Sequence, residues 1–272
     1  MTHVKMSIVA LALVFVTSCK TENKEPKTQV ETTTETVPQS APLASSIAIT
    51  PLTDSPAYAD ATLILDTPET MVIPQAGDVP FSFGLENYVL KDQTDSPNAK
   101  KLANSAKGQH IHFILNNQPY SAHYDPNFKK DIPEGVHHLV AFLSRSYHES
   151  VKNDNSVVVR KLEVGANSED KLGLDMDAPT LIYSRPKGEY TGADTNQVLL
   201  DFFVLNTTLS ENGNKVIATI NNTEFTITEW IPHVITGLPK GETTIALQLV
   251  DADGNVIPGP FNSVKRSIML KD

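Results

Sequence analysis

Three sequence blocks recur in the same order in the two halves of this 272-residue chain. The segment 110–117, His-Ile-His-Phe-Ile-Leu-Asn-Asn, aligns with 215–222, Lys-Val-Ile-Ala-Thr-Ile-Asn-Asn. The segment 83–87 aligns with 202–206 ahead of this block, and 132–143 aligns with 238–249 after it. Blocks that repeat in order and at similar spacing predict two copies of one module, each of about 100 residues.

From about Ala59 onward, short alternating apolar runs are separated by turn residues, and no segment of ten or more residues keeps a period of 3.6. A period of two is typical of β-strands. Asn-Asn, Pro-x-Gly and Asp-Gly turns between the runs favour a sandwich in each copy. The sequence therefore predicts an all-β chain with two tandem immunoglobulin-like β-sandwich modules, a His-rich one over residues 51–166 and a second over 167–272, with little helix.

The first 18 residues have the features of a secretory signal. They carry one lysine, Lys5, and an apolar run from Ile8 to Val16 that is too short to span a bilayer. The sequence Val-Thr-Ser-Cys at 16–19 resembles the lipobox of bacterial lipoproteins, which implies that residues 1–18 are removed and that Cys19 is diacylated. We then expect a lipid-anchored protein of the bacterial cell envelope, at the outer membrane on its periplasmic or surface face. The alternative is a free cysteine in an ordinary leader.

Residues 20–46 consist mainly of Thr, Glu, Lys, Pro and Ser. Such a composition buries too little apolar surface to offset the entropy of ordering the chain. Residues 19–50 are therefore predicted to be the lipidated cysteine followed by a disordered linker that holds the two modules away from the membrane.

The second copy indicates which residues of the first copy face its core. Side chains alternate between the two faces of a strand, and in 215–220 Val216, Ala218 and Ile220 are the ones that face the core. The same alternation, transferred to the aligned segment 110–115, places His110 and His112 on the outward face. The same transfer places His123 and His138 outside. The residues that it places in the core are Ile111, Phe113, Leu115, Tyr120, Ala122, Leu139, Ala141 and Leu143.

The second copy has no histidine at the four outward positions, so the module folds without them. Two histidines in a His-x-His strand lie on one face, roughly 7 Å apart, and a neighbouring strand can supply a third. Neutral imidazole is a common ligand of Zn and Cu. The sequence predicts a Cu or Zn site formed by His110, His112, His123 and His138, and the alternative is a set of solvated surface histidines.

No motif for nucleophilic or metal-dependent catalysis is present in the sequence, so we predict a non-enzymatic protein with no catalytic residue. The net charge is −10, which disfavours nucleic acid as a partner. The four arginines, at 145, 160, 185 and 266, are separated in sequence and predict no cluster, although folding could bring Arg145 and Arg160 near the histidine face.

The segments 108–117, Gly-Gln-His-Ile-His-Phe-Ile-Leu-Asn-Asn, and 183–195, Tyr-Ser-Arg-Pro-Lys-Gly-Glu-Tyr-Thr-Gly-Ala-Asp-Thr, resemble a group of Bacteroidota lipoproteins. The name phosphopeptide-binding protein is often given to members of this group, and the resemblance implies a protein or peptide partner. A phosphopeptide reader is expected to present clustered arginines. Three functions stay open: a metal- or ligand-binding lipoprotein, a phosphopeptide- or protein-binding one, and a purely structural or adhesive one.

Overall fold

The computed structural model describes residues 46–272, and Ala44–Asp272 form one compact unit. The predicted signal peptide, Cys19 and the predicted linker as far as residue 45 lie outside the described residues. Residues 46–272 form seventeen strands and two 3-10 turns, Pro97–Lys100 and Gly192–Thr195, and contain no α-helix. Within them, no helix has the length and apolar character needed to cross a membrane. The predicted all-β fold with tandem β-sandwiches is confirmed.

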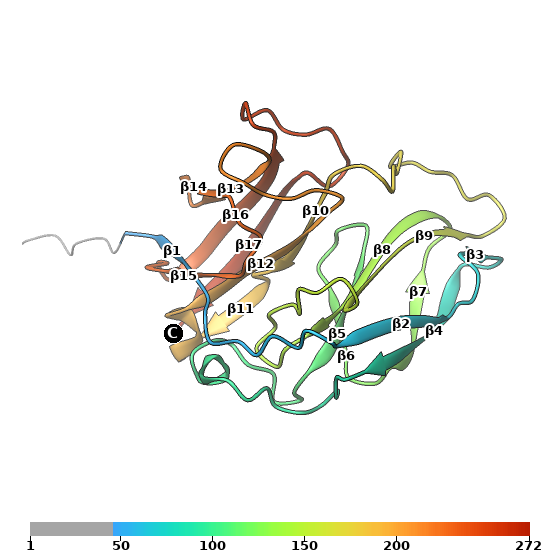
Figure 1. The fold of residues 1–272 in the computed structure, drawn as a ribbon, viewed down its shortest axis with the longest axis horizontal. Helices are drawn as coiled ribbons and strands as arrows, with labels where there is room; N and C mark the ends of the chain where they lie inside the picture. The colour runs from blue at the N-terminus through green and yellow to red at the C-terminus, as the bar shows by residue number, and fades with distance from the viewer. Residues whose placement is uncertain (1–45) are drawn as a thin grey trace, which may run out of the picture. The chain divides into compact units, whose positions relative to one another are not determined.

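The first sandwich is built from two sheets (Figure 1). Its three-stranded sheet has the order β2 (Thr62–Thr67), β4 (Gly77–Glu86), β7 (Asn127–Ile132). Its five-stranded sheet has the order β3 (Val72–Ile73), β9 (Val157–Val164), β8 (Gly135–Ser144), β5 (His110–Leu115), β6 (Ser121–His123). Apolar side chains that alternate along these strands, among them Phe81, Ile111 and Leu139, fill the space between the sheets and form the first core.

The second sandwich also has two sheets. One has the order β1 (Ala48–Pro51), β15 (His233–Thr236), β12 (Val198–Leu205), β10 (Thr180–Arg185). The other has the order β11 (Gly188–Thr191), β17 (Ser263–Lys271), β16 (Gly241–Val250), β13 (Lys215–Ile220), β14 (Thr223–Ile227). The second core between them contains Tyr183, Phe202 and Leu247.

Strand β1 comes from the end of the segment predicted to be a disordered linker. It pairs antiparallel with β15, with Ala48 opposite Thr236. Ile47 and Ile49 pack against the second core, so this short apolar stretch gains enough burial to become ordered. The chain therefore enters the second sandwich before it forms the first, and residues 48–50 belong to a sheet rather than to the linker.

The sequence repeat corresponds to the paired strands at the centre of each five-stranded sheet. Ile111 lies opposite Leu143 in the first sandwich, and Val216 lies opposite Leu249 in the second. The residues predicted for the first core on β5 and β8 are confirmed: Ile111, Phe113, Leu139, Ala141 and Leu143 are buried in it, and Leu115 packs against it partly buried.

The predicted phase of β6 is wrong. Ile111 pairs with His123 and His112 pairs with Ala122, so His123 shares the face of Ile111, while Tyr120 and Ala122 pack on the opposite face. In the second copy Val216 pairs with Ile227, which makes Ile227 the equivalent of His123. The first hairpin is one residue longer, and a one-residue slip moves every side chain of a strand to the other face.

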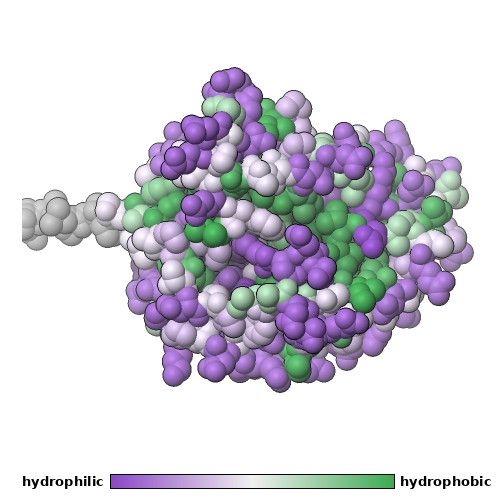
Figure 2. All heavy atoms as spheres, viewed as in Figure 1, coloured by the Kyte–Doolittle hydropathy of each residue, from purple (hydrophilic) through white to green (hydrophobic). Residues whose placement is uncertain are grey.

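The outward face of β5 and β8 is covered by the second sandwich. Ile114, Val140 and Phe142 from the first sandwich pack with Ile182 and Phe203 from the second, and we call this set, together with Phe261, the junction core. Strand β8 is consequently buried along nearly its whole length, whereas the equivalent strand β16 alternates between buried and half-exposed residues. Figure 2 shows apolar residues gathered among polar ones across the middle of the viewed face, where Figure 1 places the meeting of the two sandwiches.

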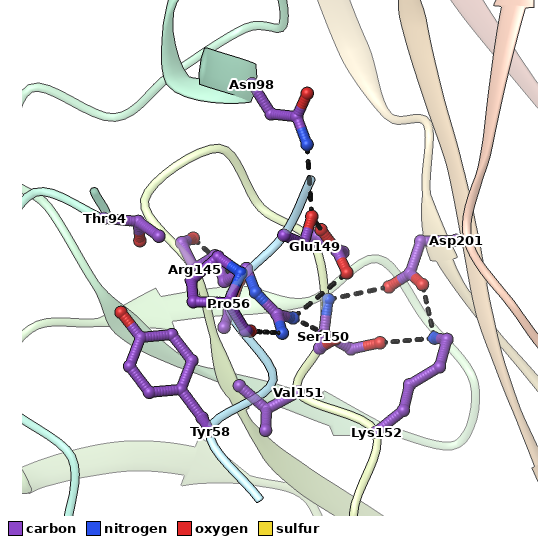
Figure 3. A network of polar contacts seen from close by, with 12 residues as sticks. Pro56, Tyr58, Thr94, Asn98, Arg145, Glu149, Ser150, Val151, Lys152 and Asp201 are labelled. Atoms are coloured by element: carbon purple, nitrogen blue, oxygen red, sulfur yellow. Dashed lines mark hydrogen bonds and ion pairs between the residues drawn. The ribbon is translucent and has the colours of Figure 1, made fainter. Parts of the chain in front are cut away.

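Buried polar contacts accompany the junction core. Lys152 Nζ lies 2.5 Å from Asp201 Oδ1, and the Ser150 backbone N–H donates to Asp201 Oδ2 at 3.1 Å. Figure 3 shows Lys152 directed toward Asp201 and, beside this pair, Arg145 directed toward Glu149 and the carbonyl of Pro56. Asp201 is fully buried on β12, so the pair joins a loop of the first sandwich to a strand of the second.

Replacing Asp201 with alanine should destabilise the protein by about 3–5 kcal/mol, because Lys152 keeps its charge in a largely buried place without a carboxylate to balance it. The free energy of unfolding from urea denaturation measures the effect. Glu189→Ala is the matched control, since it breaks an exposed ion pair with Lys271 of 2.8 Å. Equal losses in the two variants would show that the Lys152–Asp201 pair does not hold the junction.

Candidate metal site

Three imidazoles meet at the junction of the two sandwiches. His110 Nε2 lies 2.9 Å from His112 Nε2 and 3.1 Å from His148 Nδ1. The three nitrogen atoms all lie within 4.8 Å of one another. We call His110, His112 and His148 the histidine cluster; the first two are fully buried, and His148 is partly exposed.

Two different elements position these side chains. His110 and His112 alternate on β5 and therefore share the face that turns toward the second sandwich. His148 lies in the turn between β8 and β9, where its backbone N–H donates to the Arg145 carbonyl at 2.9 Å. Its φ of 70° is in the left-handed region, and this tight turn directs the imidazole back toward the end of β5.

Two hydroxyl groups complete the surroundings of the histidine cluster. The Tyr120 ring stacks on His112, with 3.5 Å between centroids and 11° between planes, and its hydroxyl lies 3.2 Å from His148 Nδ1. Ser184 Oγ of β10 lies 3.4 Å from His112 Nδ1. The second sandwich therefore contributes to the site, and neither module forms all of it alone.

The environment keeps these imidazoles neutral. Burial is the main cause that lowers the pKa of His110 to about 4, and the positive charges of Arg185 and Lys187 act in the same direction. Burial also lowers the pKa of His112 and of His148 well below the usual value, with Arg185 and Lys187 again adding to the effect. Neutral imidazole is the form that binds a metal ion.

A hydrogen bond to the backbone fixes the tautomer of one imidazole in the histidine cluster. His110 Nδ1–H donates to the Gly108 carbonyl at 2.8 Å, so that Nε2 carries the lone pair. A backbone carbonyl behind a histidine is the usual outer partner of a metal ligand. Tetrahedral coordination with bonds of about 2.0–2.1 Å needs nitrogen atoms about 3.3 Å apart. The two separations from His110 Nε2, 2.9 and 3.1 Å, are close to this value, and the third separation is at most 4.8 Å. The three imidazoles are therefore candidate ligands for a Cu or Zn ion.

His123 and His138, the other two predicted ligands, do not join the cluster. The His123 ring stacks on Phe128 at 3.4 Å on the opposite face of the sheet, as a consequence of the register of β6. His138 lies farther along β8, where its ring is 5.5 Å from that of Phe261. The prediction that all four histidines converge is wrong. The alternative of solvated surface histidines is also wrong for His110 and His112, because the second sandwich covers them.

The sequence interpretation missed His148. Periodicity could not place this residue because it lies in a turn and has no strand phase. The one available indication was composition, since six of the eight histidines fall between His110 and His148.

The structure also brings basic side chains together beside the histidine cluster. Lys187 Nζ lies 3.9 Å and Arg185 Cζ lies 5.3 Å from the centre of the Tyr120 ring, and Arg266 Cζ lies 4.2 Å from that of Tyr183. We call Arg185, Lys187 and Arg266 the basic cluster. The prediction that the arginines form no cluster is therefore wrong.

Arg145 and Arg160, the two arginines that folding could have brought near the histidine face, do not belong to this group. Arg145 is bound to Glu149 and to backbone carbonyls, and exposed Arg160 donates to the carbonyl of Val159. Arg185 and Arg266 are brought together instead because β10 and β17 lie in the two facing sheets of one sandwich.

Two cavities between the sandwiches lie apart from the histidine cluster. One, of about 600 Å³, is lined by polar residues that include Asn116, Glu134 and His137. The other, of about 620 Å³, is lined by apolar side chains that include Val157, Phe203 and Trp230. No residue of the histidine cluster lines either cavity.

No protein-family model matches the sequence, and no curated protein matches it. Among solved structures, the fibronectin(III)-like modules of Clostridium thermocellum CbhA are 12% identical, with a TM-score of 0.27 over 77% of this chain and 94% of that one. A Bacteroides ovatus protein from a mixed-linkage glucan utilization locus, SGBP-B, is 10% identical, with a TM-score of 0.23 over 76% of this chain and 47% of that one. The central fibronectin-III array of RIM-binding protein is 11% identical, with a TM-score of 0.24 over 77% and 67%. Similarities this low carry no argument about ligands or activity.

In the presence of a chelator, the protein should lose stability as the pH falls from about 6.5 to about 4. In this range the unfolded chain binds protons on its histidines at their ordinary pKa, whereas folded His110, with a pKa of about 4, does not. Below about pH 4 this contribution should level off. Urea denaturation at several pH values measures it, with the value at pH 7.5 as reference.

His148→Asn should reduce this acid sensitivity, because one imidazole with a lowered pKa is removed. Asparagine tolerates the left-handed backbone at this position. A wild type as stable at pH 5 as at pH 7.5 would contradict the burial of neutral imidazoles.

Proposed function

We propose that this protein is a non-enzymatic, membrane-anchored binding protein of the cell envelope whose histidine cluster binds Cu or Zn. The observation that carries the proposal is the convergence of three imidazole nitrogens within 4.8 Å at a buried junction. Three nitrogen ligands with an open fourth position suit either metal.

Preorganisation supports metal binding at this site. The imidazoles are already neutral, so a metal ion need not compete with the second proton of an imidazolium ring. Stacking on Tyr120 and the hydrogen bond to Gly108 fix two of the rings before a metal arrives. Little conformational entropy remains to be lost on binding.

The nearby charges favour one of the two candidate metals. Arg185 and Lys187 lie close enough to lower the pKa of His148, and they repel a bound cation by the same Coulomb interaction. A singly charged copper ion meets half the repulsion that a doubly charged zinc ion meets. We therefore rank Cu(I) ahead of Zn(II).

Replacing His148 with asparagine should weaken metal binding about a hundredfold or more, since even loss of an outer-shell partner costs about 10–100-fold. Zn(II) affinity is measured by titration calorimetry and Cu(I) affinity by competition with a chromogenic chelator. His137→Asn is the control, because His137 is also buried but bonds to Asn116 and Pro133 outside the cluster. Thermal melting checks that both variants are folded.

The same titration separates this function from a purely structural or adhesive one. A β-sandwich protein that serves only as a scaffold would bind neither metal above the level of His148→Asn. His110→Ala with His112→Ala is a poorer test, because both side chains are fully buried and their removal disturbs the junction as well as the site.

Membrane anchoring is the second part of the proposal, and it rests on Val-Thr-Ser-Cys at 16–19. Each buried methylene contributes about 0.8 kcal/mol, and stable anchoring needs more than one acyl chain. Cys19→Ser should therefore move the protein from the membrane fraction to the soluble fraction and abolish incorporation of labelled palmitate. Membrane association of the variant after a high-salt wash would contradict lipid anchoring.

A further inference from the structure

The basic cluster has no acidic counterpart. None of the ion pairs formed by residues 46–272 includes Arg185, Lys187 or Arg266. Arg185 is only 7% exposed, and the other two are partly exposed. Buried charges in proteins are normally paired, so three neighbouring cations without a carboxylate need an explanation.

Their hydrogen bonds leave donors unused. Arg185 Nη1 donates to the Tyr190 hydroxyl at 3.1 Å, and Arg266 Nη2 donates to the Asn117 carbonyl at 2.8 Å. Arg185 Nε and Arg266 Nη1 are buried without a partner. Lys187 Nζ donates to the Tyr120 carbonyl at 2.6 Å and has two further protons. Neutral partners thus hold the cations in place and leave their charge uncompensated.

Electrostatic crowding is visible in the pKa of Lys187. Burial, and then repulsion from Arg185 and Arg266, lowers the pKa of Lys187 to about 8. Burial lowers the pKa of Arg266 to about 10. An anion placed among the three groups would remove the repulsion and restore a counter-charge.

We propose that the basic cluster binds an oxyanion, phosphate or carboxylate, at the junction of the two sandwiches. The guanidinium fork of an arginine matches either group with two parallel hydrogen bonds, and lysine adds a point charge. The half-buried Lys187 leaves the cluster accessible from solvent, and the rings of Tyr120 and Tyr183 lie against its cations. Anion binding by the basic cluster is a function separate from metal binding by the histidine cluster, and it does not depend on it.

The proposal is tested by titration calorimetry with inorganic phosphate and, in a separate experiment, with acetate. The protein used contains residues 46–272 together with the native linker that precedes them. A chelator is present throughout, so that failure of the metal site cannot affect the result. Saturable binding of either anion is expected in the wild type. Stronger binding of phosphate would assign the site to phosphoryl groups, and stronger binding of acetate would assign it to carboxylates.

Lys187→Gln should weaken binding about tenfold or more, the effect of losing one charge-assisted hydrogen bond. Lys265→Gln is the matched control, because it removes the same charge from an exposed position next to Arg266, on the opposite face of β17. The anion affinity of the control should stay within about twofold of that of the wild type, because the charge of an exposed lysine is largely screened by salt. Arg266→Gln gives a second test if Lys187→Gln melts at a lower temperature.

Two results would overturn the proposal. One is the absence of saturable binding of both anions by the wild type. The other is an equal loss of affinity in Lys187→Gln and Lys265→Gln, which would reduce the effect to overall charge.

Discussion

Packing between the outward faces of two sheets, one from each sandwich, is the interaction on which the rest of this structure depends. Ile114, Val140 and Phe142 are completely removed from water by Ile182 and Phe203 of the second sandwich. Burial of apolar surface is worth roughly 25 cal/mol per Å², so this junction contributes to stability in the same way as the core of either sandwich. Because His110 and His112 share the covered face, the contact that joins the sandwiches also removes water from the imidazoles.

Polar contacts then fix how the two faces meet. Asn117 lies at the end of the first repeat block; its side chain accepts a hydrogen bond from the Tyr183 N–H at 2.8 Å and donates to the Leu181 carbonyl at 3.2 Å. Buried amides and carboxylates tolerate little displacement, because an unpaired buried polar group costs a large part of its solvation energy. β10 is therefore held in register with the first sandwich, and Arg185 and Ser184 at its end are held beside the histidine cluster. The geometry of the candidate site follows from contacts outside it.

The repeated blocks predicted the parts of the fold that are local in sequence. Strand phase identified the core residues of β5 and β8, because alternation directly reports which side of a strand is apolar. It failed at His123, where a hairpin one residue longer than its counterpart inverted the face. The burial of His110 and His112 depends on a partner more than 60 residues away, but an indication was present in Val140 and Phe142, which are large and apolar where the second copy has the smaller Ala246 and the polar Gln248. The strand pattern gave no indication of His148, which lies in a turn, or of the meeting of Arg185 with Arg266, which come from two facing sheets.

The second copy shows what the candidate site requires beyond histidines. Its equivalent outward positions, Lys215 and Ile217, are only half-buried, since residues 46–272 form no further sandwich that covers them. Imidazoles placed there would remain hydrated and would titrate near their ordinary pKa, so they would have to lose protons before binding a metal ion at mildly acidic pH. The duplication therefore produced two similar sandwiches, but only the first has an outward face buried enough to keep imidazoles neutral. In this first copy, the second sandwich covers the outward face. Neutral imidazoles and cations without a counter-charge can therefore lie side by side there.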